Sequence, residues 1–286
     1  MLTFILSTGL AVGAVYAMIG VAYNIMYSSS RVVSFTAGQL GMAGGVLGSF
    51  FALECGLGPI LSFVLAISGC VALGLATELV AVRPVLRHLD KHLYVLSTLA
   101  LALMAQNFTA IVWGTEPKPF PKFFAAWDSG LLDERFWMPC LALAVTVGGL
   151  ELLYHHSLIG RAFLAIAEDN HAARALGLPE RGLRIASFGL AGAIGGLAGF
   201  ASGQLMLAFF VNGSLFSFYG FIAVALGGLG NNRGAVICGL ALGVIQQAAN
   251  FVAGGVMASA LVYALFIVAM LLAPQGVFNA AKPRRV

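Results

Sequence analysis

The residue types that perform covalent or metal chemistry are few in this sequence, and their spacing matches no catalytic motif. Five histidines lie between apolar runs: His88, His92, His155, His156 and His171. Four cysteines form no CxxC pair: Cys55, Cys70, Cys140 and Cys238. The sequence has no HExxH, no GxSxG and no GxxxxGKS/T phosphate-binding loop. We therefore expect no catalytic, metal or cofactor site on this chain, and we interpret the cysteines as small core residues.

Sparse polar side chains inside the apolar runs point to a different chemistry, the passage of a solute. The set consists of Tyr23, Asn24, Ser34, Thr36, Gln39, Ser97, Thr98, Gln106, Asn107, Gln204, Gln246, Gln247 and Asn250. Many of these residues will hydrogen-bond neighbouring helices. If a solute pathway exists, part of the set lines it, because a zwitterion or an amide needs polar partners in an otherwise dry bundle.

The composition explains why these polar groups are so sparse. Of the 286 residues, 60% are hydrophobic and 9% are charged, with a mean hydropathy of +0.96, whereas soluble domains have about 45 to 50% apolar and about 25% charged residues. This excludes a soluble enzyme and leaves no room for a separate soluble domain. The net charge of +4 bears on membrane orientation, and we expect no nucleic-acid partner.

Eight apolar stretches are long enough to span or nearly span a bilayer. They cover residues 2–27, 32–53, 59–82, 93–113, 137–154, 185–209, 234–253 and 257–273. A further stretch, 216–229, is too short to cross alone at about 1.5 Å rise per residue and predicts a half-helix, with a re-entrant geometry left open. We therefore expect an all-α polytopic membrane protein of one domain, residues 1–286, with about eight transmembrane helices plus interrupted half-helix segments. Segments 28–45 and 216–234 are the candidate interruptions.

The basic residues predict which loops are cytoplasmic, because Lys and Arg are enriched there. With the N-terminus outside and the C-terminus inside, three basic residues are external: Lys118, Lys122 and Arg135. Twelve are cytoplasmic: Arg31, Arg83, Arg87, Lys91, Arg161, Arg174, Arg181, Arg184, Arg233, Lys282, Arg284 and Arg285. In this scheme the external loop 114–136 either receives an extracytoplasmic partner or is a passive connector on the bilayer surface.

Two acidic residues, Glu78 and Glu151, lie near the cytoplasmic ends of predicted helices. A charge within apolar sequence is costly unless it is paired or reaches the interface. Arg83 follows Glu78 by five residues. A structural ion pair or an extended side chain is therefore favoured over a proton relay.

An amphipathic stretch, 157–184, lies within the predicted cytoplasmic loop 155–184. It contains small residues, Ala172 and Ala173, and it closes with Gly177 and Pro179. The stretch is either a surface-lying helix that anchors the loop or a surface that fits a groove of another protein.

This loop resembles the coupling helix of permease subunits of ATP-binding cassette (ABC) importers. Ala172, Ala173 and Gly177 match the pattern of two alanines followed by glycine, with His171 where that motif often has glutamate. The run GRAFLAIAED followed by AARALGL is similar to the loop of branched-chain amino acid and urea importer permeases.

Three further segments are similar to the same family. Residues 9–45 resemble its opening signature, in which Phe35 and Gly38 match an NFAHG-like motif while Ser34, Thr36 and Ala37 depart from it. Residues 227–243 resemble a GGxGSxxGAxxGAxxLG segment. Residues 78–107 match the family through Glu78, Arg83, Pro84, Arg87, Gln106 and Asn107.

The resemblance implies a permease subunit in a bacterial inner membrane that carries branched-chain or other hydrophobic amino acids, or else urea, short amides or aromatic acids. It implies a second homologous permease subunit, two cytoplasmic ATPase subunits that hold ATP and Mg²⁺, and an extracytoplasmic solute-binding protein. The predicted coupling residues are Arg161, Glu168, Asp169, Ala172, Ala173 and Gly177. The candidate pathway residues are Tyr23, Asn24, Ser34, Phe35, Thr36, Ala37, Gly38, Gln39, Gln106 and Asn107. The alternative is a stand-alone channel or an ion-coupled carrier.

Overall fold

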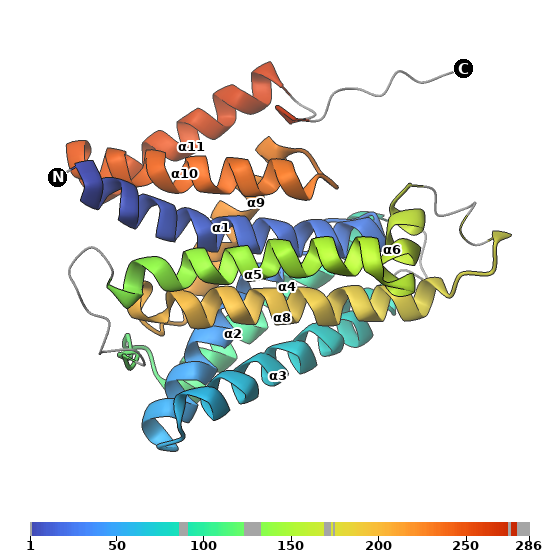
Figure 1. The fold of residues 1–286 in the computed structure, drawn as a ribbon, viewed down its shortest axis with the longest axis horizontal. Coiled ribbons are helices and arrows are strands. Elements are labelled where there is room, and N and C mark those ends of the chain that lie inside the picture. Colours follow the sequence, from blue (N-terminus) through green and yellow to red (C-terminus); the bar gives the residue numbers. More distant parts are fainter. Residues whose placement is uncertain are drawn as a thin grey trace.

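The computed structural model describes residues 2–85, 91–122, 133–168, 173, 175–273 and 276–278, and these residues are folded almost entirely into helices (Figure 1). In this part of the chain, seven helices are long and apolar enough to cross a membrane. They are α1 (Leu2–Ser30), α3 (Pro59–Thr77) with its π-helical extension Glu78–Val82, α4 (Lys91–Trp113), α5 (Glu134–His156), α8 (Glu180–Met206), α10 (Asn232–Ala253) and α11 (Gly255–Leu272). The expected all-α polytopic membrane architecture is thereby confirmed.

Three helices are shorter than the seven. They are α2 (Ala37–Ser49), continued by a π-helical turn Phe50–Glu54, α6 (Leu158–Glu168) and α9 (Asn212–Gly227). The predicted span 32–53 begins with a break, since Arg31 has a left-handed φ of 57° and the helical path resumes only at Ala37. Helix α2 and its π-helical turn nevertheless lead away from Arg31 to Lys118 and Pro119, because the Ser49 hydroxyl donates to the carbonyl of Pro119 at 2.8 Å and Glu54 pairs with Lys118.

Contacts between distant segments define the two ends of the bundle. At one end, the side chain of Arg31 contacts the last turn of α6, and Glu151 of α5 pairs with Arg233 of α10. At the other end, the backbone of Lys118 pairs with that of Ala208. Loops that the basic-residue pattern placed on the same side therefore lie together.

Helix α9 runs between these two ends and is not re-entrant. It begins four residues after Ala208, and Gly230, three residues beyond its last residue, lines the same cavity as Arg31. The backbone N–H of Gly230 donates to the Asn24 side chain at 2.9 Å. The non-helical residues on either side of α9 thus supply the length that the helix lacks.

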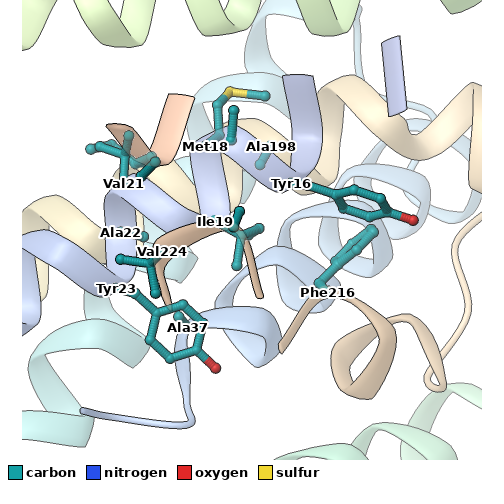
Figure 2. Packing of buried hydrophobic residues seen from close by; sticks show 14 of the residues in the cluster. Tyr16, Met18, Ile19, Val21, Ala22, Tyr23, Ala37, Ala198, Phe216 and Val224 are labelled. Carbon is teal, nitrogen blue, oxygen red and sulfur yellow. The ribbon is translucent and has the colours of Figure 1, made fainter. Parts of the chain in front are cut away.

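The core is built around α1 and α8. Each has 72% of its most apolar 18-residue window buried, against 11% in α11 and 17% in α4. Figure 2 shows side chains of α1, among them Ile19 and Ala22, lying beside Ala37 of α2, Ala198 of α8 and Phe216 of α9. Helices α4 and α11 therefore present most of their apolar surface outward, to lipid or to another subunit.

Glycines allow the central helices to touch backbone to backbone. A Cβ atom on Gly199 of α8 would overlap the carbonyl oxygen of Gly41 of α2, and one on Gly243 of α10 would overlap the backbone of Gly13 of α1. Such contacts are typical of membrane helices, where small residues permit close van der Waals packing.

We expect Gly199→Leu to destabilise the bundle, because a side chain there must separate α8 from α2. Overpacking of this kind costs about 1–3 kcal/mol, so the melting temperature of the purified protein in detergent should fall. Gly148→Leu is the matched control, since nothing lies within 4 Å of a Cβ at Gly148. Equal melting temperatures for Gly199→Leu and the parent protein would contradict this packing.

Candidate functional site

The break between α1 and α2 lies inside the protein rather than in lipid. Ser34 is fully buried, and its Oγ lies 2.9 Å from Oγ1 of Thr36. The carbonyl of Phe35 accepts from the Ser217 hydroxyl of α9 at 3.2 Å, and the Tyr23 hydroxyl donates to the Ser217 carbonyl at 3.2 Å. These bonds meet the requirement that irregular backbone at membrane depth be satisfied by protein.

A cavity of about 500 Å³ begins where this break ends, between α2, α3 and α4. Most of its wall is apolar and includes Leu40, Met42, Leu73, Leu101, Met104 and Phe108. Four residues with polar side chains also line it: Thr36, Gln39, Thr77 and Thr109. A cavity of this size with a few polar groups in an apolar wall suits a small amphiphilic molecule.

Among the polar residues of this wall, Gln39 has a side-chain carbonyl oxygen that accepts no hydrogen bond from the described residues. It is 6% exposed, and its Oε1 has no hydrogen-bond partner among the described residues. Leaving a buried carbonyl oxygen unpaired costs about 1–3 kcal/mol. The amide of Gln39 lies against Gly213 of α9, where a Cβ would overlap Oε1, so that an ammonium or amide N–H of a bound molecule could supply the missing donor only after this side chain turns toward the cavity.

Other predicted pathway residues have structural partners of their own. Ala37 is fully buried in the core, and a Cβ on Gly38 would overlap the backbone of α9 at Ser217. Gln106 accepts from the Ser214 hydroxyl at 2.6 Å. Exposed Asn107 donates to the carbonyl of Leu103, four residues earlier in α4, at 2.8 Å. Of the ten residues, Thr36 and Gln39 are the ones found in the cavity wall.

A buried ion pair lies beside this region and joins the end of α3 to α8. The carboxylate of Glu78 accepts from Nε and Nη2 of Arg184, both at 3.0 Å. The expected ion pair is confirmed, but its partner is Arg184 rather than Arg83, which is exposed. Arg184 was expected among the cytoplasmic charges and is instead buried. The second predicted acid, Glu151, forms an exposed pair with Arg233 at 2.8 Å.

The predicted coupling loop consists of two helical parts in the described residues. The first is α6, with Arg161 and Glu168 exposed on it, and helical structure returns at Ala173 and Ala175. The predicted coupling residues Asp169 and Ala172 lie outside the described residues. Gly177 is exposed with φ +80°, a conformation that favours glycine.

Ala173 faces the interior of the loop and not its outer surface. It is 2% exposed and packs with Ile166 of α6 and Leu183 of α8. Close to Ala173 in the sequence, Leu176 is apolar and exposed, with 80% of its surface accessible. The sequence motif consists of Ala172, Ala173 and Gly177 and does not include Leu176, so that the exposure of Leu176 was not predicted.

These features define a polytopic membrane protein with an interrupted helix and a solute-sized cavity. A family model described as "Branched-chain amino acid transport system / permease component" matches residues 5–271. The chain therefore belongs to this family of permease components.

Curated relatives match along nearly the whole chain. The high-affinity branched-chain amino acid transport system permease proteins LivH of Escherichia coli K12 and BraD of Pseudomonas aeruginosa are 26% and 27% identical to it. The alignments cover 97% and 98% of this chain and 96% and 97% of the relatives. The probable permease protein LivH of Methanocaldococcus jannaschii is 25% identical over 91% of this chain and 87% of its own length.

The fold is shared with a solved structure, that of PsaBC from Streptococcus pneumoniae in complex with Fab. The superposition has a TM-score of 0.53 and covers 95% of this chain and 92% of the other. At 10% identity, this likeness shows the fold alone.

We expect Arg184→Met to destabilise the protein strongly, because it leaves the Glu78 carboxylate buried without its partner. Removing one member of a buried pair costs about 3–5 kcal/mol, and the melting temperature in detergent should fall accordingly. The double variant Glu78→Gln, Arg184→Met should recover much of this loss. The matched control is Arg233→Met, which breaks an exposed pair and should change the melting temperature little. Equal effects of the two single variants would contradict the buried pair.

Proposed function

We propose that this chain is a permease subunit of an ABC importer that carries branched-chain or other hydrophobic amino acids across the inner membrane. The family match over residues 5–271 is the observation that carries the proposal. The apolar cavity with Gln39 and Thr36 in its wall supports such solutes, because an aliphatic side chain and an ammonium group need those two kinds of surface. Urea, short amides and aromatic acids are the less favoured solutes.

The proposed assembly has five components. This chain pairs with a second homologous permease subunit, and the exposed apolar faces of α4 and α11 offer surface for that contact. Two cytoplasmic ATPase subunits bind ATP and Mg²⁺, so that energy is supplied outside this chain. An extracytoplasmic binding protein delivers the solute.

The proposed orientation puts the N-terminus outside and the C-terminus in the cytoplasm. It rests on the excess of basic residues at the bundle end that holds Arg31, α6 and Arg233. The loop containing α6 and Gly177 then faces the ATPase subunits. Their nucleotide-driven movement would displace α6 and rock the bundle between outward-facing and inward-facing states.

We expect Gln39→Leu to reduce uptake about tenfold or more, because the solute loses an acceptor for its ammonium group. A hydrogen bond to a charged group contributes about 1.5–3 kcal/mol. The measurement is initial uptake of radiolabelled leucine by proteoliposomes that contain the complete transporter. Gln204→Leu is the matched control, since Gln204 also has a buried Oε1 without a partner among the described residues but is absent from the cavity wall. Equal uptake by both variants would remove Gln39 from the pathway.

The importer proposal itself is tested by purifying the protein from its native membrane and assaying reconstituted uptake with and without ATP. We expect ATPase subunits to copurify and uptake to require ATP. Leu176→Glu should weaken that copurification, because it places a charge on an exposed apolar residue of the loop. The control is Glu180→Gln, which changes a charge on the same proposed cytoplasmic side and should leave copurification unchanged. ATP-independent uptake without copurifying subunits would favour the channel or carrier.

A further inference from the structure

Arg31 occupies the junction between α1 and the break that leads to the cavity. It follows the last residue of α1 and has a φ of 57°, a left-handed conformation that non-glycine residues rarely adopt. Five residues later the chain reaches Thr36, the first residue of the break that lines the cavity. The backbone of Arg31 is therefore the point from which this irregular segment departs.

The side chain of Arg31 reaches in the opposite direction, to the C-terminal end of α6. Its Nη2 donates to the carbonyl oxygens of Ile166 at 3.3 Å and Glu168 at 3.5 Å, and also to that of Ala167 between them. Backbone carbonyl oxygens carry partial negative charge, which attracts the guanidinium. The side chain of Arg31 therefore ties residues 166–168 of α6 to the end of α1.

This link is separate from the ion pairs nearby. Arg31 shares a cavity of about 860 Å³ with Glu151, His155 and Arg233. The carboxylate of Glu151 is already bound by Arg233 at 2.8 Å and lies 3.1 Å from His155. Among the described residues, the side-chain hydrogen bonds of Arg31 go to the backbone of α6. A movement of α6 would therefore pull on Arg31 directly.

We propose that Arg31 transmits the displacement of α6 to residues 32–36 and so to the cavity wall at Thr36 and Gln39. Arg31 is in this sense a positioning residue for transport, and it contacts neither solute nor nucleotide. The inference rests on the proposed function, because it requires that ATPase subunits move α6. The guanidinium is the needed part, because it carries the hydrogen bonds to α6.

The test uses the complete transporter in proteoliposomes and measures ATP hydrolysis and leucine uptake in the same preparation. For Arg31→Ala we expect normal copurification of the ATPase subunits, basal ATP hydrolysis within about twofold of the parent, and at least tenfold less solute carried per ATP. Arg31→Lys, which can still donate to the α6 carbonyls, should restore part of the uptake. Arg233→Ala is the matched control, because it removes an exposed arginine from the same cavity without touching α6.

A second variant separates the effect of losing the guanidinium from the effect of straining the backbone at residue 31. Arg31→Gly removes the side chain but adopts the left-handed φ without strain. It should remain as uncoupled as Arg31→Ala when values are expressed per assembled transporter. Restored coupling in Arg31→Gly, or unchanged transport per ATP in Arg31→Ala, would overturn the role of Arg31.

Uptake by the parent protein distinguishes a failure of the proposed role of Arg31 from a failure of the proposed importer function. ATP-dependent uptake by the parent together with an unaffected Arg31→Ala variant rejects the link alone. Uptake by the parent that does not depend on ATP rejects the importer, and the role of Arg31 with it.

Discussion

Close contact between helix backbones at glycine residues is the constraint on which the rest of the structure depends. Lipid provides no hydrophobic force that drives one apolar helix against another, so that packing depends on how closely the backbones approach. Gly199 meets Gly41 between α8 and α2, and Gly243 meets Gly13 between α10 and α1. These contacts bury α1 and α8 and hold α2 within the bundle.

Because α2 is held inside, the chain can carry an irregular segment at its start. The hydroxyl groups of Ser34 and Thr36 bond each other, and the carbonyl of Phe35 accepts from the Ser217 hydroxyl, which makes non-helical backbone tolerable there. The cavity lies on the far side of α2, where α4 contacts the bundle sparsely. The hydrogen bonds across the break and the cavity beside α2 thus both follow from the interruption between α1 and α2.

The end of the bundle that holds Arg31 and α6 combines two kinds of electrostatic contact that differ in rigidity. The Glu78–Arg184 pair is buried and fixes α3 against α8, since breaking it would leave a charge in an apolar setting. The contact of Arg233 with Glu151 is exposed to solvent and can be exchanged for water. The buried pair keeps α3 and α8 together, whereas the exposed pair joins α5 and α10 only loosely.

The sequence by itself determined the all-α membrane class, most helix positions, the interruptions near residues 28–45 and 216–234, and the family resemblance, because long apolar runs and local motifs are properties of neighbouring residues. Tertiary structure alone decided that Arg184, 106 positions away, is the partner of Glu78 and that Ala173 faces inward. It also decided that Gln39 lines a cavity while Ala37 lies in the core. The physical reason is that membrane helices are apolar on every face, so that periodicity does not distinguish the side that meets protein from the side that meets lipid.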